Sequence, residues 1–425
     1  MRSRVLAAVG VAALLAAACS SSKSSHVNTP GGTTPTTAPA GGTAAGGTAA
    51  GGATSATPLR LLEEAPLSFA PLQPNAQTAV AAAKAAVSYV NSHGGVLGHP
   101  VELTVVDDAG NPTTAVTKLE SAINSGSKPA VFLQADASTE AAAELPILAQ
   151  NKILSFNQAP TSSSGDPAKF PYNFDLSPST ANYASAFCPY VKSHGGSSVG
   201  ILHGNDAYGD ALGPAMAKAC QDAGVKVTGT QQFELTALDM TPQLEALEAG
   251  HPSYLLLQAY GPPAGYVLQG LQKLGWNVPV LGDDSVMVSP VITSPPPSGQ
   301  LGAPTEANLK CEVFQSTVYQ ANAPAPLTAM VQGMKAQGPI PAPLILAYMY
   351  DAVVLAAAGA TKAGTTTDAA AIAKAIEAGV DAPTAIFAKY NFTTTSHSPN
   401  EDASAFAFVQ PSKVVDGQFG APGST

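Results

Sequence analysis

The side chains best suited to binding a small molecule follow predicted strands or begin predicted helices. Ser138 and Thr139 begin a predicted helix, and Glu140 lies in its first turn. The first N–H groups of a helix lack partners within it and carry partial positive charge, so this position suits an anion such as a carboxylate. Asp284 follows a predicted strand in the segment GDDS, and a carboxylate suits a cation. The pattern indicates a ligand that carries both kinds of charge.

The scaffold that positions these side chains is predicted from alternating elements. Strands of four to seven apolar residues alternate with longer helices, which indicates parallel α/β sheets. In the first unit the predicted strands are 59–62, 101–106, 130–133 and 153–156, and the predicted helices are 75–91, 113–124 and 138–150. The acidic pair Glu63-Glu64 weakens the first of these strands.

The alternation restarts after the segment LSPS at 176–179, which indicates a second lobe. Its predicted strands are 198–202, 226–233, 254–258 and 278–281, and its predicted helices are 180–192, 209–223, 241–248 and 265–274. A third section follows, with a strand around 310–319, helices near 327–336 and 344–363, and a last strand at 405–410. The fold class is α/β, with two Rossmann-like lobes.

Ligands of parallel α/β sheets bind beyond the carboxyl ends of the strands. In the first lobe these ends lead into loops 67–72, 134–139 and 157–161, and in the second into loops 203–208, 259–262 and 282–285. Six loops from two lobes therefore converge on one predicted cleft.

Residues 85–112 contain a long, gap-free motif, AAVSYVNSHGGVLGHPVELTVVDDAGNP. It combines N-x-x-GG-V-x-G with a strand and DD-x-x-N-P, and in this order it resembles the type I periplasmic binding proteins of the leucine/isoleucine/valine-binding family. The segment AYMYDAVV in the helix 344–363 also resembles that family. The resemblance implies lobe one from 59–178 plus 288–398, lobe two from 179–287 plus 399–425, and a three-segment hinge. Asp107-Asp108 match no ligand contact of the family and are expected to cap the next turn.

The resemblance also implies roles for individual residues. Ser138, Ala159 and Thr161 match the positions that hold an amino-acid carboxylate. Tyr208, Tyr260 and Asp284 match two ligand-facing tyrosines and the acidic residue that holds the ammonium group, with Asp283 or Asp136 as further candidates for that acidic role. A carboxylate between aromatic faces would hold a cation by charge and cation–π contact. The first loop departs from the family's glycine-rich turn, and its residues Phe69, Leu72 and Asn75 are expected to shape the side-chain pocket.

The N-terminus resembles a bacterial lipoprotein signal. Arg2 and Arg4 precede an apolar run that is too short to cross a membrane, and small residues precede Cys19. We therefore expect a signal peptide at 1–18 and a lipidated Cys19. Residues 19–58 are rich in Gly, Thr, Ala and Pro and are expected to form a disordered tether. The protein would be exported and anchored to the outer face of the cytoplasmic membrane.

Charge and cysteine content restrict the partners. The net charge is −10 with 11% charged residues and no basic patch, so nucleic acid is not an expected partner. Three cysteines remain in the body, and we favour a Cys188–Cys220 disulfide over a pairing with Cys311. Histidines without ligand spacing predict no metal and no cofactor.

The leading hypothesis is a monomeric solute-binding lipoprotein that delivers a small amino acid or related compound to the permease subunits of an ABC importer. A ligand-sensing subunit for a membrane receptor or kinase is the alternative, and neighbouring genes would discriminate between them. An enzyme is disfavoured, because the chain has no Gly-x-Ser-x-Gly elbow, zinc motif or P-loop.

Overall fold

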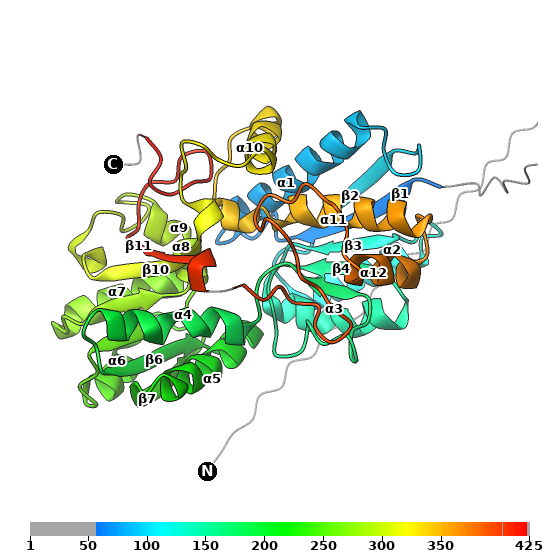
Figure 1. Ribbon diagram of the computed structural model, residues 1–425. Coiled ribbons are helices and arrows are strands. Elements are labelled where there is room, and N and C mark those ends of the chain that lie inside the picture. Colours follow the sequence, from blue (N-terminus) through cyan, green and yellow to red (C-terminus); the bar gives the residue numbers. More distant parts are fainter. Residues whose placement is uncertain (1–56, 402, 423–425) are drawn as a thin grey trace, which may run out of the picture. The chain divides into compact units, whose positions relative to one another are not determined.

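The computed structural model describes residues 57–401 and 403–422, which form two α/β lobes (Figure 1). The predicted signal peptide, Cys19 and all but the last residues of the predicted tether lie outside the described residues. In Figure 1 the blue, cyan and orange segments lie in one lobe, and the green segments lie in the other.

Lobe one contains a five-stranded parallel sheet with helices on both faces. In the order β2-β1-β3-β4-β5 its strands are β2 (Val101–Asp107), β1 (Leu59–Ala65), β3 (Val131–Gln134), β4 (Leu154–Asn157) and β5 (Asn173–Asp175). Its helices are α1 (Gln73–Ser92), α2 (Pro112–Asn124), α3 (Ser138–Gln150), α10 (Ala325–Gln337), α11 (Tyr348–Ala363) and α12 (Ala369–Glu377). Helices α2 and α3 pack together, whereas α1 packs on α10 and α11.

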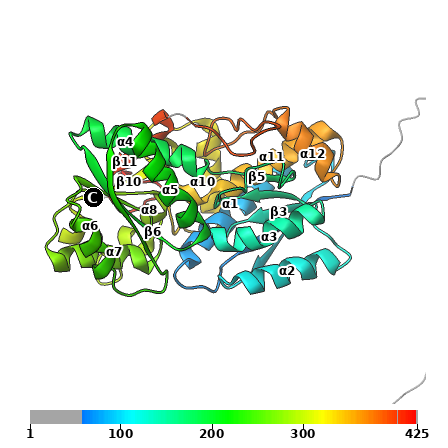
Figure 2. The ribbon, with the colours of Figure 1, turned by 90° about the horizontal axis from the view of Figure 1, so that it is seen from below.

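Lobe two contains a six-stranded sheet that is parallel except for its edge strand β11. In sheet order the strands are β11 (Phe406–Val409), β10 (Leu309–Phe314), β9 (Val280–Gly282), β8 (Tyr254–Leu257), β6 (Ser198–Gly204) and β7 (Lys226–Phe233). The helices are α4 (Thr180–Ser193), α5 (Ala207–Asp222), α6 (Thr241–Glu248), α7 (Pro262–Leu274), α8 (Asp284–Met287) and α9 (Pro290–Thr293). Figure 2 shows α4 and α5 on one side of this sheet and α6 and α7 on the other.

The two sheets repeat one topology. In lobe one the second strand lies outside the first and the third lies on the other side, and β7-β6-β8-β9-β10 has the same arrangement in lobe two. In such a sheet the connections diverge to opposite faces between the first and third strands, which leaves a crevice at their carboxyl ends. The crevices lie beyond β1 and β3 in lobe one and beyond β6 and β8 in lobe two.

The lobe boundary expected at residue 288 is wrong. Strand β10 pairs with β9 and β11 in the second sheet, and α8 and α9 pack beside it. The chain therefore stays in lobe two until the end of β10 and its following turn, Gln315–Thr317. It returns to lobe one with α10, which packs on α1. The proline-rich loop after α9 thus connects elements of lobe two only.

Strand β1 continues through the glutamates that were expected to weaken it. Glu63 and Glu64 are both fully buried, and they point to opposite faces of the sheet because strand residues alternate. Burial raises the pKa of each carboxyl to about 8, so both are largely protonated at neutral pH. A neutral carboxylic acid is far cheaper to bury than a carboxylate, which explains why the strand tolerates them.

Residue types at helix ends explain several boundaries. Asn111 precedes α2, and its side chain accepts hydrogen bonds from the N–H groups of Thr113 and Thr114, with Pro112 at the first helical position. Asp107 and Asp108 accept N–H bonds from Ala109 and Gly110, so the expected turn-capping role of this pair is confirmed. These local bonds fix the loop that follows β2.

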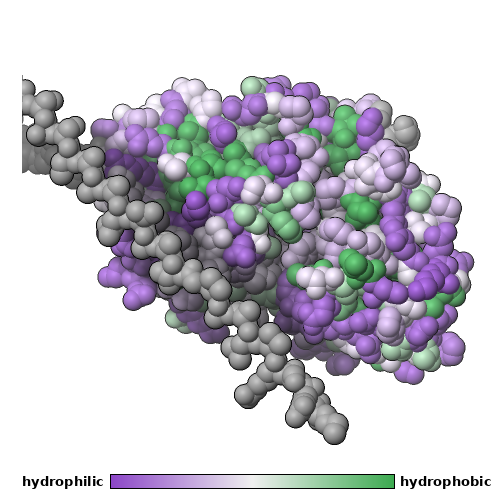
Figure 3. Space-filling model, turned by 180° about the vertical axis from the view of Figure 1, so that it is seen from behind, coloured by the Kyte–Doolittle hydropathy of each residue, from purple (hydrophilic) through white to green (hydrophobic). Residues whose placement is uncertain are grey.

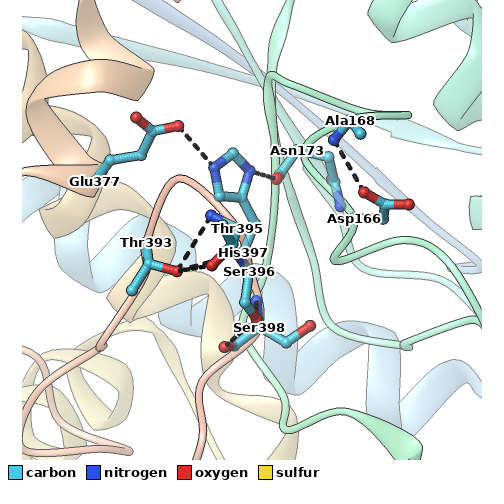
Figure 4. Close-up of polar contacts among 9 residues, drawn as sticks. All are labelled: Asp166, Ala168, Asn173, Glu377, Thr393, Thr395, Ser396, His397 and Ser398. Carbon is cyan, nitrogen blue, oxygen red and sulfur yellow. Dashed lines mark hydrogen bonds and ion pairs between the residues drawn. The ribbon is translucent and has the colours of Figure 1, made fainter.

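The last crossing segment is fastened to lobe one by His397. Its buried ring lies between the carboxyl group of Glu377, 2.9 Å from Nε2, and the carbonyl oxygen of Asn173, 2.7 Å from Nδ1 (Figure 4). The ring also stacks on Phe174, with centroids 4.1 Å apart. Nearby, Asp175 accepts hydrogen bonds from the hydroxyl groups of Ser398 and Ser164. The hinge segment is therefore held by side-chain contacts that reach α12 and β5.

The cysteines pair as favoured. Cys188 in α4 and Cys220 in α5 form a disulfide with a Cα–Cα distance of 5.2 Å, and Cys311 is a buried free thiol. The alternative pairing with Cys311 is thereby excluded. The bond joins two consecutive helices that cover the same side of the second sheet.

One described segment, Leu344–Ala363, is long and apolar enough to span a membrane, but 83% of it is buried inside the protein. It contains α11, whose Asp351 accepts hydrogen bonds from two backbone N–H groups and from Tyr390. Its apolar character reflects a position at the centre of lobe one. On the face drawn in Figure 3, hydrophilic residues are widespread and apolar residues gather in separate patches.

Candidate functional site

A cavity of about 130 Å³ lies between the lobes and is called the inner chamber here. Its walls come from the loops after β1, β3 and β4 in lobe one and after β6, β8 and β9 in lobe two. These are the carboxyl ends of parallel strands, where ligands of such sheets bind. A chamber of this size suits a small molecule, since an engineered cavity of roughly 150 Å³ holds benzene.

Most of the sequence-predicted site residues meet in the inner chamber. Those that line it are Leu72, Asn75, Asp136, Ser138, Ala159, Tyr208, Tyr260 and Asp284. They come from six loops or helix starts that are distant in sequence and belong to both lobes. The structure thus brings these residues together, and their contact with a ligand stays a prediction.

Three predicted residues lie outside this chamber. Phe69 and Thr139 line an adjoining cavity of about 440 Å³, called the outer chamber here. Thr161 lies at a separate recess, and its hydroxyl oxygen accepts hydrogen bonds from the N–H groups of Ser163 and Ser164. The Thr161 side chain therefore stabilises its own turn.

Asp284 begins α8 and is the acidic group expected to bind an ammonium ion. Its carboxyl oxygen Oδ2 accepts a hydrogen bond of 2.7 Å from the Tyr183 hydroxyl, which lies 3.4 Å from the Tyr348 hydroxyl. Burial raises the pKa of Asp284 to about 6, and the bond from Tyr183 limits this rise. Asp284 is therefore mostly ionised at neutral pH. The neighbouring Asp283 is fully buried, and burial raises its pKa well above the usual range.

Ser138 joins the two lobes. Its hydroxyl donates a hydrogen bond of 3.2 Å to Asp206 and accepts one of 3.0 Å from the N–H group of Tyr208. Asp206 also caps α5 by accepting from the N–H groups of Tyr208 and Gly209. Because Ser138 belongs to lobe one and Asp206 to lobe two, these bonds hold the lobes in a closed arrangement.

The donors expected to hold a ligand carboxylate hydrogen-bond within the protein. The Ser138 hydroxyl donates to Asp206, the Ala159 N–H donates to the Asn157 side chain at 2.9 Å, and the Thr161 N–H donates to the Ser164 hydroxyl at 2.8 Å. In this closed arrangement all three donors are used by hydrogen bonds within the protein. Helix α3 has no side-chain cap, so the N–H groups of its first turn are the remaining positive feature of this wall.

Asp136 is a buried carboxyl group at the end of β3. It is 4% exposed, lines both chambers, and receives no hydrogen bond from an N–H or hydroxyl donor at either oxygen. Burial and the nearby carboxyl group of Asp108 raise its pKa well above the usual range. Burial and the neighbouring carboxyl group thus favour the uncharged form of Asp136.

Asp136 and Tyr260 occupy equivalent positions in the two lobes. The tripeptide Leu-Gln-Ala leads from β3 to Asp136, and the same tripeptide leads from β8 to Tyr260. Both residues line the inner and the outer chamber, so they face the junction of the two from opposite lobes. The repeated tripeptide was a signal in the sequence for this pair, but its meaning depends on knowing that β3 and β8 have the same place in their sheets.

Comparison with known proteins accounts for this architecture. Residues 66–413 match the periplasmic binding protein family. The chain belongs to this family. Among curated relatives, Leu/Ile/Val-binding protein homolog 3 of Brucella melitensis is 25% identical over 322 residues, which cover 75% of this chain and 84% of that protein. The leucine-, isoleucine-, valine-, threonine-, and alanine-binding protein of Pseudomonas aeruginosa is 24% identical, covering 70% of this chain and 76% of that protein.

Solved structures confirm the predicted fold of this periplasmic binding protein. The periplasmic binding protein type 1 from Bordetella pertussis Tohama I superposes with a TM-score of 0.70 at 20% identity, covering 84% of this chain and 97% of that one. The predicted family and the predicted pair of α/β lobes are therefore both confirmed.

Sequence reasoning missed several residues of the inner chamber in this periplasmic binding protein. They are Pro66, Gln158, Tyr183, Asp206, Val288, Ile345 and Tyr348. Tyr183 lies in the first turn of α4, which follows the short strand β5, and Tyr348 lies in the first turn of α11, which follows no strand. Strand β5 was not predicted from the sequence, so a search restricted to predicted strand ends could not find either residue. Among residues 57–401 and 403–422, no three His, Cys, Asp or Glu side chains are placed to hold a metal ion.

Proposed function

We propose that this periplasmic binding protein is an extracytoplasmic solute-binding lipoprotein of an ABC importer, without catalytic activity. It captures a small amino acid or a related compound by closure of its lobes and presents the closed form to the permease. The names of the curated relatives, which are leucine-, isoleucine- and valine-binding proteins, support this ligand class. Export and attachment through Cys19 follow from the N-terminal sequence.

The inner chamber is the observation that carries the proposal. It is small, both lobes contribute to its walls, and the Ser138–Asp206 hydrogen bond joins the two lobes at its lining. A ligand there contacts both lobes only when they are closed, so binding energy favours the closed form over the open one. The ionised Asp284 between Tyr183 and Tyr208 supplies a position for an amino group.

A thermal-shift panel combined with small-angle X-ray scattering tests the proposal. The panel contains amino acids, their amides, the corresponding amines and small carboxylates. A ligand at about 100 times its dissociation constant stabilises the folded state by roughly 2.7 kcal/mol, and closure reduces the radius of gyration. Stabilisation without compaction would contradict capture by lobe closure, and a panel without any stabilising compound would contradict the ligand class.

A charge-matched pair of variants separates a site effect from a general effect. Asp284→Asn removes the carboxylate of the chamber, whereas Asp222→Asn removes an exposed carboxylate at the end of α5, where it pairs with Lys218. Only the first variant should abolish the thermal shift. Equal loss in both variants would show that the ligand does not depend on the inner chamber.

A further inference from the structure

The outer chamber continues the inner chamber toward the mouth of the cleft. The two chambers share the wall residues Pro66, Leu72, Asp136, Ala137 and Tyr260. The outer chamber, of about 440 Å³, is the larger of the two. The two chambers are therefore neighbours, and a ligand in the inner chamber can extend past Asp136 and Tyr260 into the outer one.

The outer chamber is built largely from apolar side chains of both lobes. Lobe one contributes Phe69, Pro71 and Pro112, and lobe two contributes Leu235, Leu238 and Tyr266. Phe69 and Leu238 are 39% and 75% exposed, which is unusual for large apolar residues in this protein. Apolar side chains held at an open cavity favour an apolar ligand group, because its contact removes their surface from water.

Neither chamber offers a side chain that could neutralise an anion. No Lys, Arg or His lines either of them, whereas Asp136, Asp206 and Asp284 line the inner chamber and Glu140 lines the outer one. The hydroxyl and backbone donors expected for a carboxylate are already bonded within the protein. The buried Tyr208 hydroxyl and the first-turn N–H groups of α3 are among the donors that remain at the inner chamber, and none of these carries a full positive charge. With several carboxyl groups and no basic side chain in its walls, the cleft suits a cationic ligand.

We propose that the cleft takes an amine with an apolar tail, whose ammonium group binds Asp284 in the inner chamber and whose tail passes between Asp136 and Tyr260 into the outer chamber. No ligand carboxylate is required. The ammonium group satisfies the carboxylate that Tyr183 already orients, and the tail covers Phe69 and Leu238. This inference deepens the proposed function and rests on it for the location of the ligand.

A matched set of ligands tests the inference by isothermal titration calorimetry with the full-length protein at pH 7.5. Leucine and 3-methylbutylamine differ only in the carboxylate, and we expect the amine to bind at least as tightly. In the series from propylamine to octylamine we expect roughly fourfold tighter binding for each added methylene until the outer chamber is filled. Hexanoate and octanoate should not bind.

Two surface variants locate the tail. Leu238→Ser removes an exposed apolar wall of the outer chamber and should weaken octylamine much more than propylamine. Tyr319→Ser replaces an exposed aromatic residue that lines neither chamber, and it should leave the whole series unchanged. An unchanged dependence on chain length in Leu238→Ser would overturn the assignment of the outer chamber to the tail.

The outcomes separate this inference from the function it rests on. If leucine binds and compacts the protein while 3-methylbutylamine binds more than tenfold more weakly, the amine assignment is overturned and the solute-binding function stands. If amines bind but the radius of gyration from scattering does not decrease, the ligand class is supported and capture by lobe closure is overturned. If neither amino acids nor amines bind, both are overturned.

Discussion

Two carboxyl groups on opposite sides of the cleft show how neighbours rather than burial decide which one keeps its charge. Asp284 in lobe two accepts a hydrogen bond from the Tyr183 hydroxyl, and its pKa rises only to about 6. Asp136 in lobe one faces the carboxyl group of Asp108 and no N–H or hydroxyl donor, and its pKa rises well above the usual range. The environment in lobe two therefore keeps the charge of its carboxyl group, whereas the environment in lobe one favours the uncharged form.

The largest expected effect comes from removing the charged member of this pair. Asp284→Asn keeps the shape of the side chain but replaces a charge-assisted hydrogen bond by a neutral one, which costs about 2 to 3 kcal/mol, or roughly 100-fold in affinity for an amine ligand. Calorimetry on this variant and on Asp222→Asn measures the difference. An affinity within threefold of the parent protein would mean that lobe two does not supply the charge.

The pH dependence of binding sharpens the same comparison. Below pH 6 a proton competes with a cationic ligand for Asp284, so the affinity should fall about tenfold for each further pH unit. The hydroxyl groups of Tyr183, Tyr208 and Tyr348 surround this group and stay uncharged in that range, and burial also raises the pKa of the neighbouring Asp283. Titrations between pH 5 and 8 should show the break near pH 6. A break near pH 4 would indicate that Asp284 is not desolvated in the free protein.

Protein stability should respond to pH more strongly through Glu63 in lobe one than through Glu306 in lobe two. Burial raises the pKa of Glu63 to about 8 and that of Glu306 in lobe two to about 7. A group whose pKa is higher in the folded state stabilises the protein fully below its unfolded pKa, and this stabilisation is lost as the pH rises through the folded value. The melting temperature of the free protein should therefore fall from pH 5 to pH 8.

Two variants assign that fall to the lobes. Glu63→Gln should flatten the dependence of the melting temperature on pH more than Glu306→Gln, because the carboxyl group of Glu63 has the larger shift. Differential scanning calorimetry at half-unit intervals provides the measurement. If the Glu306 variant has the larger effect, the greater share of the titration belongs to lobe two.

The smallest expected effect concerns the neutral member of the pair. Asp136→Asn replaces one of two facing carboxyl groups by an amide that can donate to Asp108, so the melting temperature at pH 7.5 should rise by about 1 to 2 °C. Amine affinity should change far less than in Asp284→Asn. A hundredfold loss of affinity would instead place the ammonium group against Asp136.

The sequence predicted the fold well where one lobe alone determines the pattern. Helix α3 begins at Ser138 and ends at Gln150 as expected, and β7 has its predicted limits, because apolar periodicity and turn residues are local signals. Strand β5 consists only of Asn173–Asp175 and contains one apolar residue, so no local sequence pattern predicts it. The glutamates of β1 were taken as a boundary because their protonated state depends on burial, which requires the folded lobe.

The candidate site was less predictable because it depends on contacts between lobes. Leu72, Asp136, Tyr208 and Asp284 follow strands and reach the chamber as expected. Tyr183 and Tyr348 enter it from helices beside the hinge, and their proximity to Asp284 follows only from how the crossing segments place those helices. The hydrogen bond from the Ser138 hydroxyl to Asp206 also requires both lobes, so neither sequence segment alone predicts it.

The attachment of the chain before β1 has a mechanical consequence. Thr57 lies beside Thr366, whose hydroxyl donates a hydrogen bond of 2.7 Å to the Thr57 carbonyl oxygen, so the preceding chain joins lobe one at the amino end of its sheet. The cleft is at the carboxyl end of that sheet. In the proposed form that is anchored through Cys19, tension in the preceding chain would act on lobe one alone, and lobe two would rotate on the hinge without that load.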